Sequence, residues 1–234
     1  MKAIFILLIF TLCSVPNQKQ GQVIILNKSS KLFHDRQCQK ENQNTRLKFL
    51  EEVTISERSE KVVGIKKGVT LIGWTNSENT SLIPESWGYY NMHVLKLRVP
   101  PESKFNFIEA DSINEKDEKT KEYKLFNDDY FIQVERLNSN IESYIQKNPP
   151  EEILFTSPKV NLKYNSLLFN GKKYFYFTSI DVMDGRKFHK IVFEGNDNEV
   201  ISIIITLNKK SYSEFFEMDA LKILFSAEPR KNKF

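Results

Sequence analysis

Few side chains in this sequence have the chemistry for catalysis or metal binding. The chain has three histidines, His34, His93 and His189, and two cysteines, Cys13 and Cys38. Nucleophilic catalysis needs a serine or cysteine activated by a base, and no histidine here stands in a motif typical of such a pair. A hydrolase would therefore need a site assembled from distant residues, with His93 or His189 within hydrogen-bond reach of a serine, aspartate or glutamate in a cleft.

His34 and Cys38 form the one pair with metal-ligand spacing, because residues four apart share a face of a helix. Two ligands do not close a zinc site, and no second pair follows, so we expect no metal and interpret both as polar surface residues. The chain also has no Gly-rich phosphate loop, no His-Glu-x-x-His and no Gly-x-Ser-x-Gly, so we expect no cofactor. His189 lies in a strand-like run and is interpreted as a half-buried sheet residue.

One short segment has the composition of a binding surface. Trp87, Tyr89 and Tyr90 lie within four residues, between Pro84 and His93. Large rings provide much contact area at little entropic cost, so Trp87, Tyr89, Tyr90 and His93 are the candidate residues for binding a ligand or partner. The alternative is that the rings fold down and cover the core.

Composition narrows the class of protein. The 234 residues are 40% hydrophobic, which is enough for a real core and excludes a disordered chain. The net charge of +4 comes from 34 basic and 30 acidic residues in mixed order, so no nucleic-acid partner is expected. The 18 Phe and 9 Tyr leave carriage of a small apolar ligand open, beside an unknown protein partner.

The N-terminus predicts export. Lys2 precedes an apolar run over Ala3–Phe10, followed by a polar stretch, so residues 1–20 are predicted to be a signal peptide. The run is too short for an ordinary transmembrane helix. The alternative is a buried N-terminal element. We expect a periplasmic, secreted or envelope-attached protein whose mature chain starts between Val15 and Val23.

Cys13 is a candidate for lipidation, because it follows the apolar run as the acceptor of a bacterial lipoprotein does. Leu12 departs from that pattern, in which the preceding residue is small. Contact with a membrane is expected only if Cys13 is lipidated. If Cys13 leaves with the signal peptide, Cys38 is left alone and cannot close an intramolecular disulfide.

The remaining chain divides into three parts. Residues 21–60 are expected to be loosely structured, although 23–26 are strand-like and Thr45–Val53 fits either a helix or a strand. Residues 61–229 are predicted to form one α+β domain, and 230–234 a basic tail. The predicted strands of the domain are Val69–Trp74, Met92–Val99, Lys104–Ile108 and Tyr123–Leu137, with a solvated loop over Asp111–Lys121.

Two turn signals predict three antiparallel strands in series. Asn170-Gly171 and Asp184-Gly185 both tolerate the positive φ of a type I′ turn. With two-residue loops, the facing pairs are Leu167 with Tyr174, Tyr164 with Phe177, Phe177 with Val192, and Ile180 with His189. The apolar run Glu199–Thr206 should be a central strand covered on both faces.

Two helices are expected, each opened by a capping box. Ser139 with Glu142, and Ser211 with Glu214, have the required spacing. The second helix carries an apolar stripe and should pack on the sheet. The predicted fold class is therefore α+β, an antiparallel sheet with packed helices in a sandwich-like arrangement.

This order of elements resembles the PsbP-like α/β/α sandwich domains. The resemblance is carried by Tyr130–Val134 leading into Asn140–Tyr144, and by the terminal run Leu221–Ser226. It covers about two thirds of the chain as a pattern and has no invariant signature. It implies an exported, non-enzymatic accessory or binding domain and gives no functional residues.

We therefore expect an exported, non-catalytic binding or accessory protein that acts through a surface. One version is an immunity-type protein that neutralises a toxin with a rigid patch. The alternative class is an exported hydrolase with a site assembled from distant residues.

Overall fold

The structure is a computed structural model that describes residues 21–113, 119–150, 163–180, 185–196, 199–208 and 214–230. The predicted signal peptide with Cys13, and residues 231–234 of the predicted tail, lie outside the described residues and stay predictions. Neither described α-helix combines the length and the apolar run needed to cross a bilayer.

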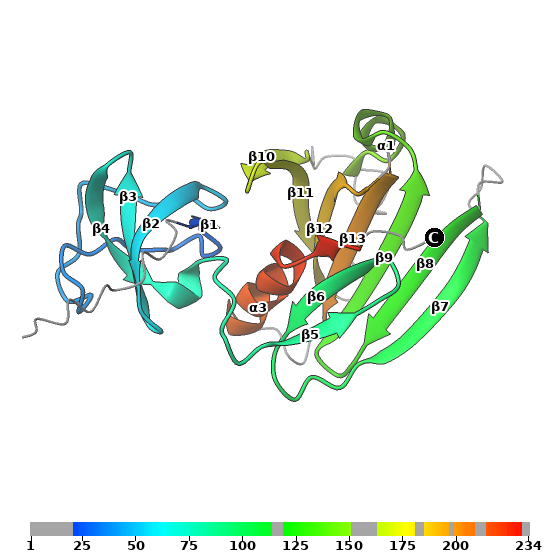
Figure 1. Ribbon diagram of the computed structural model, residues 1–234, viewed down its shortest axis with the longest axis horizontal. Helices are drawn as coiled ribbons and strands as arrows, with labels where there is room; N and C mark the ends of the chain where they lie inside the picture. Colours follow the sequence, from blue (N-terminus) through cyan, green and yellow to red (C-terminus); the bar gives the residue numbers. More distant parts are fainter. Residues whose placement is uncertain are drawn as a thin grey trace, which may run out of the picture.

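The first unit is a four-stranded antiparallel sheet, here called the N-terminal sheet, at one end of the molecule (Figure 1). Residues 21–60, expected to be loose, provide two of its strands, and only the end of the ambiguous run Thr45–Val53 enters one of them. Val53 and Ile55 alternate with less buried residues, as in a strand with one face on a core. The strands are β1 (Gln22–Ile24), β2 (Glu52–Arg58), β3 (Val62–Lys67) and β4 (Thr70–Asn76), followed by the short η1 (Ser77–Asn79).

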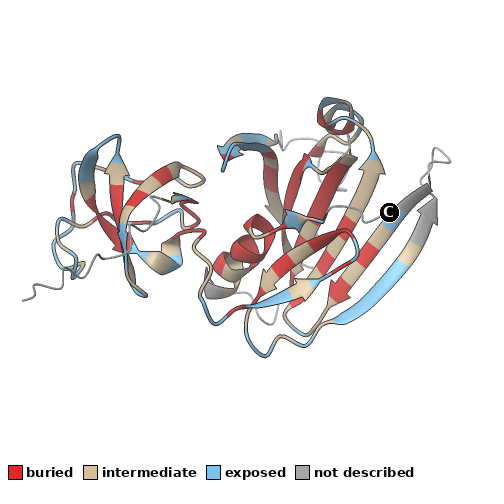
Figure 2. Cartoon of the chain, in the orientation of Figure 1, coloured by how far each residue is buried: buried red, intermediate tan, exposed pale blue. Residues whose placement is uncertain are grey.

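The second unit is the large sheet, whose seven strands are all antiparallel. Its order is β10-β11-β12-β13-β9-β8-β7, so β13 is central as predicted, and most of its residues are buried on both faces (Figure 2). The strands are β7 (Asn106–Ile113), β8 (Lys119–Phe126), β9 (Tyr130–Asn138), β10 (Asn165–Phe169), β11 (Lys172–Ile180), β12 (Lys187–Glu194) and β13 (Glu199–Leu207). Helix α1 (Ile141–Lys147) follows β9.

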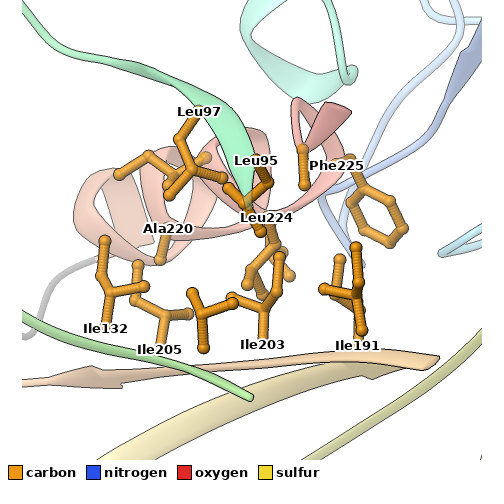
Figure 3. Packing of buried hydrophobic residues seen from close by; sticks show 14 of the residues in the cluster. Leu95, Leu97, Ile132, Ile191, Ile203, Ile205, Ala220, Leu224 and Phe225 are labelled. Atoms are coloured by element: carbon orange, nitrogen blue, oxygen red, sulfur yellow. The ribbon is translucent and has the colours of Figure 1, made fainter. Parts of the chain in front are cut away.

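A second layer covers one face of the large sheet. It consists of helix α3 (Glu214–Phe225) and a three-stranded sheet in the order β14-β6-β5, here called the covering sheet. Its strands are β5 (Gly88–Asn91), β6 (Leu95–Val99) and β14 (Glu228–Pro229). Figure 3 shows Leu95 and Leu97 of β6, with Leu224 of α3, meeting Ile203 and Ile205 of β13. Burial of these apolar side chains stabilises the two layers against each other.

The predicted fold class is wrong. The protein is β-rich, with its strands in three antiparallel sheets, and only α1 and α3 are α-helices among the described residues. The error has a physical cause: part of the layer that helices were expected to supply is the covering sheet. The predicted loop Asp111–Lys121 was also wrong, because its ends belong to β7 and β8, with 114–118 outside the described residues.

The first hairpin has the predicted register and the second does not. Asn170 and Gly171 have φ of 49° and 73°, and Leu167 faces Tyr174. In the second, Phe177 faces Lys190 and Ile180 faces Lys187, two residues from the prediction. The strands end at 180 and resume at 187, so the connection is longer than a two-residue turn; Asp184 lies outside the described residues. An even shift keeps each side chain on its predicted face.

The turns before and after β9 use asparagine. Tyr123–Leu137 is two strands, and Asn127 Oδ1 accepts hydrogen bonds from the backbone N–H groups of Asp129 and Tyr130 in the turn between them. The N-cap of α1 is Asn140, whose side chain accepts from Ser143 N at 2.8 Å, so the cap lies one residue after the predicted Ser139. Ser211 lies outside the described residues.

Candidate functional site

The aromatic segment that the sequence singled out is split between core and surface. Trp87 is only 7% exposed and belongs to the main core. Tyr90 is half-buried and meets Phe105 edge to face at 5.9 Å, while Tyr89 is 56% exposed. Tyr89 and Tyr90 are neighbours on β5, so they point to opposite faces. Of the three predicted binding rings, only that of Tyr89 is freely offered to a partner.

Tyr89 lies over two cations of the adjacent strand. The guanidinium carbon of Arg98 is 4.5 Å from the centroid of the Tyr89 ring, and Lys96 Nζ is 5.8 Å from it. Arg98 pairs with Tyr89 in the strand register and donates through Nη2 to Pro84 O at 3.3 Å. These cation–π contacts hold an exposed ring in a defined place. We call Tyr89, Lys96 and Arg98 the outer β5–β6 face.

Strand β5 is an edge of the covering sheet. Only β6 pairs with it among the described residues, so its second edge offers backbone groups that could bond an added strand. A Cβ added at Gly88 would meet no atom within 4 Å, which shows open space at the start of the strand. The outer β5–β6 face therefore combines an exposed ring, two cations and an edge without a partner strand.

His93 is the second predicted binding residue at the surface. It lies in the turn between β5 and β6, and its Nε2 is 3.8 Å from Glu109 Oε2 on β7. Glu109 also faces Lys121 Nζ at 3.6 Å. This contact between an imidazole and a carboxylate lies on the surface between two sheets, and among the described residues it includes no serine or cysteine that a base could activate.

His189 is sealed inside the protein. Its side chain has no exposure, its Nδ1 is 2.8 Å from the Tyr176 hydroxyl, and its Nε2 is 3.7 Å from Glu217 Oε1 on α3. Burial, then the charges of Lys187 and Lys28, lower the pKa of His189 to about 3, so the ring is neutral at pH 7. The Glu217 distance exceeds a normal hydrogen bond. The half-buried residue expected from the sequence is thus fully buried and cannot meet a substrate.

A cavity of about 390 Å³ lies beside this cluster, between residues 26–29 of the first unit and the side chains of Lys187 on β12 and Glu217 on α3. Lys28 and Met218 line it from the two sides, with the ion pair of Lys187 and Glu217 beside them. Lys28 Nζ also lies 5.4 Å from the centroid of the Phe49 ring. The contact continues inward, because Phe49 meets Tyr176 edge to face at 5.9 Å. Around the cavity, the two units therefore meet through an ion pair, a cation–π contact and an edge-to-face pair of rings.

Lys190 is a buried cation that sequence reasoning missed. It follows His189 on β12 and so points to the opposite face, under α1. It is 3% exposed, and its Nζ donates to the Tyr144 hydroxyl at 2.9 Å. Burial lowers the pKa of Lys190 to about 8, opposed by the charge of Glu135. Its place between Phe188 and Val192, which lie on the same face of the strand, could have indicated burial, but the charge favoured a surface position.

The spaced pair His34 and Cys38 does not form a metal site. Within the part of the chain that the structure describes, no three His, Cys, Asp or Glu side chains are placed to hold a metal ion. The two residues belong to a tight turn, in which the Asp35 carboxylate accepts hydrogen bonds from the backbone of Gln39 and Lys40. The bond from Gln39 is the largest cause of the lowered pKa of Asp35.

Comparison with known proteins gave no match, either to a family model or to a curated protein. The resemblance to PsbP-like domains therefore stays a prediction.

Proposed function

We propose that this is an exported, non-catalytic binding protein that recognises a protein partner through the outer β5–β6 face. The observation that supports this most strongly is the Tyr89 ring, exposed to solvent yet held over Arg98 and Lys96 beside an edge of the covering sheet. Tyrosine and arginine are enriched among the residues that dominate binding energies at interfaces. Export rests on the predicted signal peptide.

The chemistry of this face favours an extended partner segment with acidic side chains. The backbone of β5 can pair with an added strand, and the Tyr89 ring gives it apolar contact area. Arg98 and Lys96 favour carboxylates on that segment. The immunity-type version and other accessory roles share this surface, and the identity of the partner distinguishes them.

Binding is favoured over the hydrolase hypothesis because the histidine closest to a catalytic arrangement has no access to a substrate. His189 is enclosed and neutral, and its neighbours Tyr176 and Glu217 are held in the same cluster. The carriage of a small apolar ligand has weaker support, since Tyr174, Phe193 and Phe225 pack on one another in the core.

The test is affinity purification of the tagged full-length protein from its host, comparing the wild type with Tyr89→Ala. Leu168→Ala is the matched control, because Leu168 is equally exposed, at 58%, but lies on the edge strand β10 of the large sheet. We expect a stoichiometric partner with the wild type and the control, lost with Tyr89→Ala. Retention by Tyr89→Ala, or no partner at all, would contradict the proposal.

Mass spectrometry of the purified protein tests the export part separately. We expect a mature chain that starts between residues 15 and 23 and lacks the apolar run. A lipid mass on a chain beginning at Cys13 would instead show membrane attachment. An intact Met1 in protein from the host would contradict export.

A further inference from the structure

A cavity of about 530 Å³ lies in the N-terminal unit and shares no residue with the outer β5–β6 face. Leu32 and Leu47, both buried in the core of the N-terminal sheet, contribute its apolar part. The rest of the lining is polar or charged and comes from two segments, 28–31 and 41–46. An apolar part with polar walls is typical of sites for small polar molecules.

Hydrogen bonds next to the two segments attach this part of the chain to β4 and shape the cavity without a ligand. Phe33 exchanges two backbone hydrogen bonds with Trp74 of β4, at 2.7 and 2.8 Å. Asn42 donates from its backbone to Leu32 O at 2.7 Å and from its side chain to Ile72 O at 3.3 Å. A preformed site avoids the entropic cost of ordering on binding.

Gly73 is required for this attachment. Its φ is +152°, and a Cβ there would lie 2.6 Å from Phe33 O and 2.7 Å from Leu32 Cγ. Any other residue would push the segment 32–42 away from β4. The close approach of this segment to β4 therefore depends on the glycine at position 73.

Within the part of the chain that the structure describes, two cations at the cavity have no acidic partner. Lys31 is paired with Glu41 at 2.8 Å, and the two charges cancel locally. Among the described residues, Lys28 contacts only the ring of Phe49, and Arg46 makes no ion pair or hydrogen bond. An arginine with an unused planar fork is suited to bidentate bonds with a carboxylate or phosphate.

The remaining polar groups suit a ligand with hydroxyls. The side chains of Ser29, Gln43 and Thr45 line the cavity and make no hydrogen bond with other described residues. Each can both donate and accept a hydrogen bond. We infer that this cavity binds a small, hydroxyl-rich anion, of the class of sugars that carry a carboxylate or a phosphate group.

Isothermal titration calorimetry of the purified protein tests this inference, with glucuronate, glucose 6-phosphate and uncharged glucose as probes. We expect at least one anionic sugar to bind at least about tenfold more tightly than glucose, because a charged hydrogen bond adds roughly that factor. Binding of both anions indicates the shared chemistry, and binding of one identifies the anionic group.

Two variants locate the site. Arg46→Gln should weaken binding of the anionic probe about tenfold. Lys67→Gln, which removes an exposed cation from β3 outside the cavity, should leave it unchanged. No binding of either anion, glucose binding as tightly, or equal losses in the two variants would overturn the inference. If the partner expected at Tyr89 were not found, the outcome of this titration would not change, because the cavity shares no residue with the outer β5–β6 face.

Discussion

The outer β5–β6 face and the buried polar groups of the large sheet use the same kinds of side chain for opposite purposes. On the outer face, a tyrosine lies over Arg98 and Lys96 and stays open to solvent. Inside, His189 contacts Tyr176 and Lys190 donates to Tyr144, with both polar residues almost fully enclosed. The residue types alone therefore do not separate recognition from architecture.

The difference lies in what covers each strand. Strand β12 is interior to the large sheet and has α1 near one face and α3 near the other, so His189 and Lys190 are both covered although they point in opposite directions. Strand β5 is an edge with one face on the core, so Tyr90 is covered and Tyr89 is not. Position in the sheet decides which titratable and aromatic groups can meet a partner.

The largest expected effect separates two aromatic residues that the sequence treated as equivalent. Trp87→Ala should lower the free energy of unfolding by about 3 to 5 kcal/mol, because it opens a cavity in the main core. Urea unfolding followed by circular dichroism measures this. A loss below about 1 kcal/mol would place Trp87 at the surface and restore it as a binding residue.

The second effect is acid destabilisation through His189. Its folded pKa of about 3 lies below the unfolded value of 6.5, so the unfolded chain binds the extra proton as the pH falls through that window. The free energy of unfolding should drop by about 2 to 3 kcal/mol between pH 7 and pH 4 from this residue. Urea titrations of wild type and His189→Gln at both pH values isolate the contribution of His189 to this drop in the free energy of unfolding. The contribution should be absent in the variant. Equal pH dependence in the two proteins would show that water reaches His189.

The same comparison explains what could be predicted from the sequence. Short-range chemistry was predictable: Asn170-Gly171 formed its turn, and the double-sided apolar run of β13 became the central strand. Long-range pairing was not, because charged segments such as those around Glu109 and Lys121 have the composition of loops yet pair as strands. Trp87 is buried in the main core and Tyr89 is exposed because of how the layers pack, and local sequence does not encode that packing.

The third effect is at alkaline pH and concerns Lys190. Its folded pKa of about 8 lies below the unfolded value of 10.5, so the folded chain releases its proton first. The unfolded chain then binds more protons, and stability should rise by about 2 kcal/mol between pH 7 and pH 10. Lys190→Met should remove this rise, as measured by urea unfolding at the two pH values. If the stability of the variant rose by the same amount between pH 7 and pH 10, the rise would come from groups other than Lys190.

The smallest expected effect is at the outer face and completes the contrast with Trp87. Tyr89→Ala removes a ring that is 56% exposed and has only cation–π contacts on its face, so the free energy of unfolding should change by no more than about 1 kcal/mol. Tyr90→Ala, one residue along the same strand, removes the contact with Phe105 and should cost clearly more. Thermal unfolding of the two variants side by side measures the difference. If Tyr89→Ala were the more destabilising variant, the Tyr89 ring would stabilise the folded protein, and its exposure would no longer argue for a binding partner.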